Sequence, residues 1–380
     1  MIDIKDKREC CGCTACASIC PHNAIAMKPD VFGFKYPVVD IKKCVDCGVC
    51  NKVCAFNDNY ALSLNFDTPI AYAARHKDIN EIMASRSGAT FVAISDYILS
   101  LGGVIYGVGY TDHFRVAHKR ATTKTERDEF RGSKYVQSDL GDIFSKVKDD
   151  LKKDYLVLFV GTPCQTSGLN SYIGKKLRKN LLLIDIVCHG VTGPRLWEEY
   201  IDYIEKKEGS KITWVNFRDK DQFGWDAHVE TFKIENKPKE KIHYAHGFYK
   251  SIMFRPSCNN CHFCNIRRPS DITLGDFWGW QNVCPEMNRD NKGLNLILLN
   301  TEKGVSIFDE IKEQLVLRKL EEGSYLQPNL MYPTVEHKKR DTFEKDYREK
   351  GVGYVVNHNY DPEPIQIRLK RVLRKLIDKI

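Results

Sequence analysis

The sequence lacks the features of an exported or membrane-spanning protein. No stretch of its 380 residues approaches the roughly 20 apolar side chains that a membrane-spanning helix needs, and Asp185 interrupts the most apolar run, residues 181–187. The first ten residues contain no apolar segment of a secretion signal. The net charge of +8 is small for this length and too diffuse to indicate nucleic-acid binding. We therefore expect a cytoplasmic protein.

Cysteine, by contrast, is abundant and unevenly distributed. Nine of the 15 cysteines lie within the first 54 residues. The total is odd, and the local spacing is too tight for a framework of disulfides that connects separate loops. In a reducing cytoplasm such thiols stay reduced and bind metal. The sequence therefore predicts a metalloprotein.

The N-terminal cysteines form two copies of one unit, C-x2-C-x2-C-x3-C, about 34 residues apart. This is the bacterial-ferredoxin spacing, in which the fourth cysteine of each run ligates the 4Fe-4S cluster of the other run. We assign cluster I to Cys10, Cys13, Cys16 and Cys54, and cluster II to Cys44, Cys47, Cys50 and Cys20. Two zinc sites are the alternative, but zinc usually takes separated pairs of ligands. Residues 1–60 are predicted to form a two-cluster ferredoxin domain with a hairpin at residues 32–39, and Cys11 is an extra thiol packed near a cluster.

From residue 69 onward, apolar strands alternate with helices. Strands are predicted at residues 69–75, 104–110, 155–160, 181–187, 212–217, 228–234 and 294–299, and helices at 87–101, 142–152 and 194–207. Continuous apolar strands separated by helices indicate an α/β core with both sheet faces covered. The predicted fold is α+β: a two-cluster ferredoxin-like domain, followed by an α/β body at residues 68–320 and a C-terminal extension at residues 321–380.

A third cysteine group, Cys258-x2-Cys261-x2-Cys264, repeats the three-thiolate step without a nearby fourth member. We predict a third 4Fe-4S cluster here. Cys188 is the preferred fourth ligand because it follows a buried strand, Cys164 is the alternative, and Cys284 is the remaining candidate. Zinc held by the three cysteines and His262 is the competing interpretation.

Four loops carry residues suited to a bound ligand. Residues 87–88 open a helix, whose free N–H groups favour a phosphate. Residues 132–138 combine small residues with a cation, and residues 161–165 and 188–190 follow buried strands, where α/β sheets hold ligands. Ordinary turn chemistry explains each loop alone, but two loops at adjacent strand ends indicate one pocket. No Gly-x-Gly-x-x-Gly follows a strand, so a nicotinamide site of the Rossmann type is unsupported.

These segments resemble the coenzyme F420 hydrogenase/dehydrogenase beta-subunit family of iron–sulfur flavoproteins. The resemblance rests on Arg86-Ser-Gly-Ala, Gly132-Ser-Lys-Tyr-Val-Gln-Ser, Gly161-Thr-Pro-Cys-Gln, Val187-Cys-His-Gly, the third cysteine group, and residues 271–279 and 291–304. Together with the ferredoxin part it covers residues 1 to about 320. In its fusion order the chain is most similar to bacterial members found beside polysaccharide-biosynthesis genes.

The resemblance implies FAD as the central cofactor. Ser87 and Gly88 would meet its phosphates, although Ala89 stands where many members have a second glycine. The flavin pocket would be lined by Ser133, Lys134, Gln137, Thr162, Pro163, Cys164 and Gln165. For catalysis, Lys134 would stabilise negative charge on reduced flavin or substrate, Cys164 would lie against the cofactor, and His189 would donate a proton or, alternatively, be structural.

The predicted function is an iron–sulfur flavoprotein oxidoreductase. It would pass electrons from reduced ferredoxin through the 4Fe-4S clusters to FAD and on to an organic substrate, such as a sugar or polysaccharide precursor. The alternatives are a coenzyme F420 oxidoreductase and a non-catalytic electron-transfer subunit of a larger complex. Residues 365–380 are predicted to form a basic amphipathic helix, which would lie on the inner membrane face, dock a partner, or pack as an ordinary terminal helix.

Overall fold

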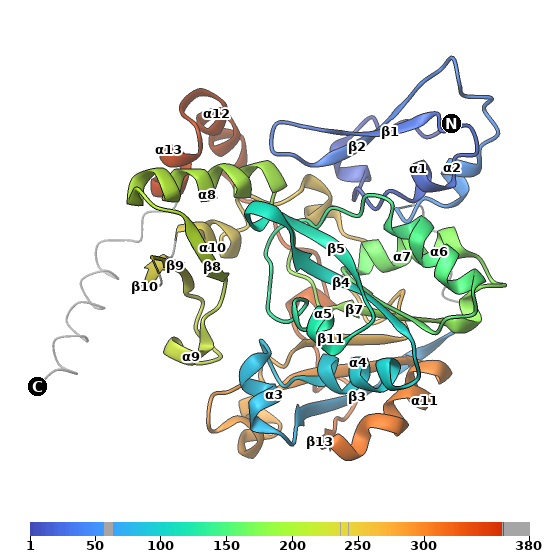
Figure 1. The fold of residues 1–380 in the computed structure, drawn as a ribbon, viewed down its shortest axis with the longest axis vertical. Helices are drawn as coiled ribbons and strands as arrows, with labels where there is room; N and C mark the ends of the chain where they lie inside the picture. The colour runs from blue at the N-terminus through green and yellow to red at the C-terminus, as the bar shows by residue number, and fades with distance from the viewer. Residues whose placement is uncertain (57–63, 236, 242, 359, 361–380) are drawn as a thin grey trace, which may run out of the picture.

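The computed structural model describes residues 1–56, 64–235, 237–241, 243–358 and 360, and its first 56 residues form a small domain around an antiparallel hairpin (Figure 1). The hairpin pairs β1 (Ile25–Pro29) with β2 (Lys35–Val39). The predicted hairpin segment, residues 32–39, forms only its turn and second strand. Two short helices, α1 (Ala15–Ile19) and α2 (Val49–Lys52), each begin inside one of the cysteine runs.

The body of the protein is a mixed eight-stranded sheet with the strand order β13-β3-β12-β11-β7-β6-β4-β5. The strands are β3 (Asn65–His76), β4 (Val104–Tyr110), β5 (Val116–Ala121), β6 (Val157–Gly161), β7 (Leu181–Ile186), β11 (Ile272–Asp276), β12 (Asn295–Thr301) and β13 (Leu315–Lys319). The four central strands β4, β6, β7 and β11 run parallel, and the outer pairings are antiparallel. Central parallel strands explain why this part of the sequence contains continuous apolar runs.

Helices cover both faces of this sheet. On one face, α4 (Thr90–Ser100) and α11 (Glu302–Ile311) bury Ile98 and Phe308 in the same core as strand residue Leu182. On the other face, α6 (Ile143–Lys152) and α7 (Pro163–Ile173) bury Phe144 and Leu169. The N-terminal domain contributes Ala15, Phe56 and neighbouring side chains to this second core, so it belongs to the same layer as α6 and α7. The predicted α+β class with a covered α/β sheet is confirmed.

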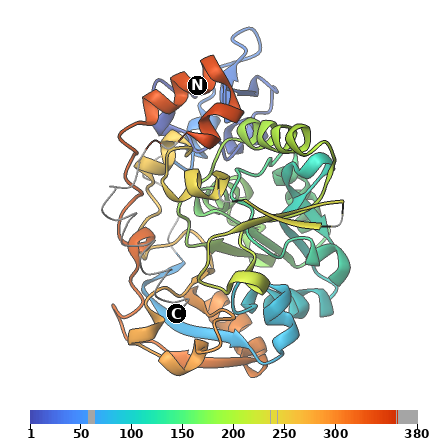
Figure 2. The same ribbon diagram turned by 90° about the vertical axis from the view of Figure 1, so that its left-hand side faces the viewer.

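A separate lobe projects from the sheet on the left of Figure 1. It contains α8 (Pro194–Glu208), α9 (Lys220–Phe223), α10 (His243–Tyr249) and a three-stranded sheet of β8 (Ile212–Asn216), β9 (Glu230–Ile234) and β10 (Lys237–Lys241). Helices α12 (Arg340–Lys350) and α13 (Val352–Asn357) pack on this lobe and lie beside the N-terminal domain (Figure 2). There the ring of Phe32, in the hairpin turn, stacks on Tyr347 with ring centroids 4.9 Å apart.

Two short helices, α3 (Ile79–Ala84) and α5 (Lys124–Asp128), complete the elements used below. Within the part of the chain that the structure describes, no helix combines the length and apolarity needed to cross a membrane. The amphipathic helix predicted at residues 365–380 lies outside the described residues.

Candidate metal centres and adjoining ligand site

The two N-terminal cysteine runs adopt the same backbone turn. In each run, the residues on both sides of the second cysteine have positive φ: Gly12 and Thr14 at 70° and 67°, and Asp46 and Gly48 at 50° and 72°. This left-handed conformation costs energy for residues other than glycine. Its repetition at matching positions indicates that each turn is shaped to present three thiols to one centre.

The four cysteines assigned to cluster I lie together. Burial raises the pKa of Cys16, and the neighbouring thiols of Cys13, Cys10 and Cys54 raise it further. The Cys10 sulfur also accepts a hydrogen bond from the Arg255 guanidinium, with Nη2 and Sγ 3.7 Å apart. Burial raises the pKa of Cys10, and the charge of Arg255 and the N–H donors oppose this effect, because they stabilise the thiolate form that binds metal.

The four cysteines assigned to cluster II line one cavity, together with Pro21, His22 and adjoining residues. Backbone N–H groups already point at two of the sulfurs: Ile2 at Cys50 (3.2 Å) and Ala24 at Cys20 (3.4 Å). Cys47 is exposed, and the exposed side chain of Val45 flanks it. Cluster II is therefore placed at the surface, whereas the sulfurs of cluster I are mostly buried against the body.

The third cysteine group is assembled at the carboxyl end of β7. Burial raises the pKa of Cys188 well above its usual value, and Cys258, Cys164 and Cys261 add to this shift, so these thiols are neighbours. Cys261 also forms a hydrogen bond with Cys264. Cys284 lies elsewhere, in the core cluster that contains Phe277 and Leu296. Both Cys188 and Cys164 therefore adjoin the run at residues 258–264, and Cys284 does not.

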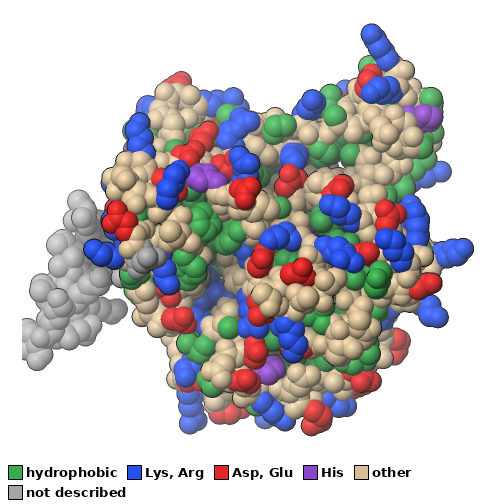
Figure 3. Space-filling model, in the orientation of Figure 1, with side chains coloured by type: hydrophobic (Ala, Val, Ile, Leu, Met, Phe, Trp, Pro, Cys, Tyr) green, Lys and Arg blue, Asp and Glu red, His purple; other side chains and the backbone are tan. Residues whose placement is uncertain are grey.

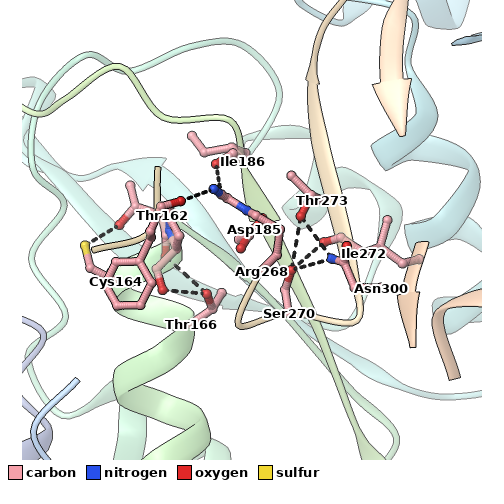
Figure 4. Close-up of polar contacts among 12 residues, drawn as sticks. Thr162, Cys164, Thr166, Asp185, Ile186, Arg268, Ser270, Ile272, Thr273 and Asn300 are labelled. Atoms are coloured by element: carbon pink, nitrogen blue, oxygen red, sulfur yellow. Dashed lines mark hydrogen bonds and ion pairs between the residues drawn. The ribbon is translucent and has the colours of Figure 1, made fainter. Parts of the chain in front are cut away.

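Arg268 fixes the loop of this third group to the sheet. Its guanidinium forms an ion pair with Asp185 of β7 at 3.2 Å and donates to the carbonyl of Ile186 at 2.9 Å (Figure 4). It also donates to the carbonyl of Phe263, between Cys261 and Cys264. Arg268 thereby ties the loop to Asp185, three residues before Cys188, which follows the same strand.

The described cysteines are not grouped as a zinc site with three thiolates would be. A tetrahedral zinc with bonds of about 2.3 Å would hold its sulfurs roughly 4 Å apart. Among the residues that the structure describes, no three cysteine Sγ atoms lie within 4.8 Å of one another. The ring of His262, the nitrogen ligand of the zinc interpretation, stacks on Phe56 with centroids 4.5 Å apart. The donor set thus suits a cubane, whose thiolates occupy separate corners.

A direct sulfur contact joins cluster I to the third group. Cys11, the extra thiol of the first run, is buried, and hydrogen bonds to Cys13 and Cys164 raise its pKa well above the usual value. The pKa of Cys164 is lowered to about 7, because its hydrogen bonds with Cys11 and with Thr162 outweigh the effect of burial. Cys11 therefore lies between a ligand assigned to cluster I and a candidate ligand of the third cluster.

Arg255, three residues before Cys258, reinforces this junction. Its guanidinium donates to the carbonyls of Cys10 (2.8 Å) and Lys35 (2.9 Å) and to the side-chain oxygen of Gln137 (2.9 Å). It also lies over the ring of Tyr36, 4.2 Å from the centroid, and is 1% exposed. One side chain thus links the third cysteine loop to the backbone beside cluster I.

The residues predicted around the flavin do not all face one cavity. The side-chain oxygen of Gln137 accepts a hydrogen bond from Arg255, and its side-chain amide donates to the carbonyl of Cys11 at 2.8 Å. The Gln137 side chain therefore links the N-terminal domain to the body, and its contact with a flavin stays a prediction.

The polar side chains at residues 161–165 mainly stabilise the N-terminus of helix α7. Thr162 and Gln165 form a capping box at the start of α7, with Pro163 at its first position, and Gln165 donates to Ser138 at 3.0 Å. Only Cys164 of this loop faces the other thiols. The hydroxyl of Thr162 contacts the Cys164 sulfur at 3.2 Å (Figure 4).

The remaining predicted catalytic residues have different hydrogen-bond partners. Lys134, beside the half-buried Ser133, donates to the carbonyls of Arg131 (3.0 Å) and Gly132 (3.4 Å), and burial lowers its pKa to about 7. The ring nitrogens of His189 contact Asn329 (3.3 Å) and Ser251 (3.4 Å). Burial lowers the pKa of His189, which favours the neutral ring.

Ser87 and Gly88 are covered rather than open to a phosphate. The Ser87 hydroxyl donates to the carbonyl of Leu294 at 3.0 Å and accepts from the indole N–H of Trp225 at 3.1 Å. A Cβ at Gly88 would lie 2.4 Å from the carbonyl oxygen of Ala74. The helix itself begins at Thr90, whose N–H donates to Asn295 at 3.1 Å.

A group of basic and aromatic residues beside Ser87 was not predicted. Arg86 and Arg218 lie here with Asp276, and the rings of Trp225 and Trp278 stack 4.6 Å apart. These segments come from separate parts of the chain, and the sequence signal is limited to three tryptophans and several cations near predicted loops. Nothing in that signal indicates that they meet.

Two family models match this arrangement. Residues 154–322 match the family described as the C terminus of the coenzyme F420 hydrogenase/dehydrogenase beta subunit, and residues 9–57 match the 4Fe-4S dicluster domain.

Individual relatives are more distant. A dihydromethanopterin reductase (acceptor) of Methanosarcina mazei is 31% identical over 100 residues, which cover 25% of this chain and only 38% of the reductase. A chain from the F420-reducing NiFe hydrogenase complex of Methanosarcina barkeri aligns with a TM-score of 0.47 and 16% identity, covering 78% of this chain and 91% of that one.

Proposed function

Because the chain joins a 4Fe-4S dicluster domain to the C-terminal domain of the coenzyme F420 hydrogenase/dehydrogenase beta-subunit family, we propose that it is an oxidoreductase that moves electrons from reduced ferredoxin to an organic substrate. The observation that carries this proposal is the sulfur contact of Cys11 with Cys13 and Cys164. It connects the dicluster domain to the cysteines of the body without an intervening layer of apolar side chains.

The proposed ligands follow the grouping of the thiols. Cluster I would be held by Cys10, Cys13, Cys16 and Cys54, cluster II by Cys44, Cys47, Cys50 and Cys20, and a third cluster by Cys258, Cys261, Cys264 and Cys188, with Cys164 as the alternative fourth ligand. FAD is the proposed organic cofactor. When bound, the clusters exchange single electrons and the flavin exchanges one or two, which matches a single-electron donor to a two-electron substrate.

The fit of the chain to FAD depends on the basic and aromatic group beside Ser87. The Nε atom of Arg86 is buried without a hydrogen-bond partner within the described structure, so it has a donor available for an acidic group. The partly exposed ring of Trp278 offers a stacking surface. These features suit a ligand with a flat ring and a negative charge.

The protein residues have separate proposed tasks. Exposed Cys47 marks the end of the dicluster domain that a ferredoxin can approach, and buried Arg255 sets the separation between cluster I and the third cysteine loop. Cys164 and His189 adjoin the third group, where His189 can hold a proton on a ring nitrogen. Lys134 supplies a cation whose charge depends on pH near neutrality.

A sugar or polysaccharide precursor is the substrate suggested by the gene context of similar bacterial members. A second candidate is a coenzyme F420 oxidoreductase. The name of the 31% identical relative, a dihydromethanopterin reductase, favours a reducible heterocycle as substrate.

Anaerobic purification with assays of iron and flavin tests the proposal. We expect about 12 iron atoms and one FAD per chain, and flavin reduction by reduced ferredoxin. Turnover is then measured with coenzyme F420 and with candidate sugar precursors. Protein that retains neither cubane iron nor flavin contradicts the proposal. Bound clusters and FAD without turnover would instead indicate an electron-transfer subunit.

A further inference from the structure

Arg86, Arg218 and Lys220 are neighbouring cations. Figure 3 shows basic side chains in a hollow between the projecting lobe and the sheet body. Arg86 follows α3, and Arg218 and Lys220 adjoin and begin α9. Arg86 donates from Nη1 to the carbonyl of Arg218 at 3.0 Å and from Nη2 to the carbonyl of Trp225. The Lys220 ammonium donates to the carbonyls of Ile82 and, at 2.9 Å, Lys292.

The carboxylates nearby do not balance these charges. Asp276 pairs with Arg218 at 2.5 Å, and Asp221, within electrostatic reach of Lys220, is exposed to solvent. Arg218 and Lys220 are only 4% and 7% exposed. Buried cations without matching anions are costly, so this concentration of charge indicates a binding site for an anion.

The pKa shifts of two of the three cations agree with this imbalance, whereas the pKa of Arg218, which pairs with Asp276, is raised. Burial and then the charge of Arg86 lower the pKa of Lys220 to about 7. Burial and then the charge of Arg218 lower the pKa of Arg86 to about 10. An anion bound among the three cations would oppose both effects, because an opposite charge stabilises the protonated forms.

An aromatic strip runs from these cations to the third cysteine group. Arg218 lies over Trp278, 5.3 Å from the ring centroid, and His228 lies between Trp278 (6.0 Å) and Tyr249 (4.1 Å). Tyr249 in turn stacks on His189 at 6.4 Å, and His189 directly follows Cys188. The strip is therefore continuous from a redox centre to a basic site.

We propose that Arg86, Arg218 and Lys220 bind a phosphate group of an elongated ligand whose flat ring lies along this aromatic strip. The ring's position beside the third cysteine group rests on the proposed function, whereas the phosphate site rests on the cations alone. Arginine side chains and Lys220 replace the helix start as the phosphate contact, because Ser87 and Gly88 are covered. The phosphate belongs either to the diphosphate of a bound dinucleotide cofactor or to a phosphorylated substrate.

Isothermal titration calorimetry of the anaerobically purified, cluster-loaded full chain, after removal of flavin, tests this proposal. The ligands are inorganic pyrophosphate, FAD and riboflavin, which lacks phosphate. We expect pyrophosphate to bind and FAD to bind at least about tenfold more tightly than riboflavin. R86M and K220M are each expected to weaken pyrophosphate binding about 10- to 100-fold, because each removes a charged donor. R86K, which keeps the charge, should recover most of the affinity.

The matched control is K303M. Lys303 is a half-buried lysine that also donates to two backbone carbonyls, of Arg178 (2.7 Å) and Leu181 (3.0 Å), but its neighbouring carboxylate is Asp271. K303M should leave all three affinities unchanged and controls for the loss of a lysine that is bonded to backbone carbonyls.

The outcomes separate the two sources of phosphate and the two hypotheses. Loss of FAD and pyrophosphate affinity together in R86M and K220M assigns the site to a cofactor, whereas loss of pyrophosphate affinity alone assigns it to a substrate. Folded R86M and K220M with unchanged affinity for both ligands, or a wild-type chain that binds neither, overturns the phosphate site. A wild-type chain that binds pyrophosphate but not FAD contradicts the flavin proposal and leaves the phosphate site standing.

Discussion

Replacing Arg255 by methionine should lower the reduction potential of cluster I. The Arg255 guanidinium lies 3.7 Å from the Cys10 sulfur and donates to the Cys10 carbonyl at 2.8 Å. A cluster gains one negative charge on reduction, so a nearby cation stabilises its reduced form more than its oxidised form. R255M removes the cation while its methionine still fills part of the space.

The size of the shift follows from the strength of the lost interaction. A hydrogen bond to a charged group contributes about 1.5–3 kcal/mol. If about 1.4 kcal/mol of this is specific to the reduced cluster, the midpoint potential falls by about 59 mV, since the couple transfers one electron. R255K retains the charge and should shift the potential less. It should still lose stability, because an ammonium cannot donate simultaneously to Cys10, Lys35 and Gln137.

An anaerobic redox titration followed by electron paramagnetic resonance measures this effect, with iron content as a check on cluster loading. The control is R127M, which removes another 1% exposed arginine, paired with Asp96 and Asp128 and bonded to Val92 and Ser95 rather than to a cysteine. We expect one cluster signal to shift in R255M and none in R127M. Iron-replete R255M with all potentials within about 15 mV of wild type would refute the argument, since the predicted shift is about four times larger.

Three further predictions concern the metal sites, the phosphate site and the packing of the domains. C188S should lower the iron content from about 12 to about eight atoms per chain, whereas C284S should leave it unchanged. If C164S loses iron and C188S does not, Cys164 is the fourth ligand. Lys220, whose pKa is about 7, loses its charge as the pH rises through neutrality, whereas sulfate keeps its charge. The affinity of the chain for sulfate should therefore fall over this pH range, and K220M should remove the pH dependence. An affinity that stays constant from pH 6 to 8 in the wild type contradicts that assignment. G168A should lower the thermal midpoint, because its Cβ would lie 2.8 Å from Cys13, at a cost of about 1–3 kcal/mol. S171A in the same helix is the control, and equal midpoints for the two variants would exclude the clash.

The parts of this protein that sequence reasoning could predict are those governed by local spacing. The two cysteine runs specify their own turns, so the dicluster domain was predictable from residues 10–54 alone. The buried strands β6 and β7 were predictable because continuous apolar runs identify central strands. Strand β11, Ile272–Asp276, was missed because it is short and contains a glycine next to an aspartate.

The features that the sequence did not indicate depend on contacts between distant segments. Arg255 donates to the side-chain oxygen of Gln137, 118 residues earlier, and neither segment indicates the other. The Thr162–Gln165 loop resembled a ligand loop because capping boxes and ligand loops use the same small polar residues. The group of cations at Arg86 and Arg218 was not predicted, because the two residues are 132 positions apart and the sequence around one gives no sign of the other.

If the proposed function holds, the shared core beneath the N-terminal domain makes the electron path a fixed one. Ala15 and Phe56 pack in the same apolar cluster as Phe144 and Leu169 of the body, so this ferredoxin-like unit is not a carrier on a flexible tether. A tethered carrier finds its acceptor by diffusion, and its transfer rate depends on linker length. Here folding itself fixes the separations between the sulfurs. A substitution that loosens this core should therefore slow electron transfer within the chain before it causes loss of metal.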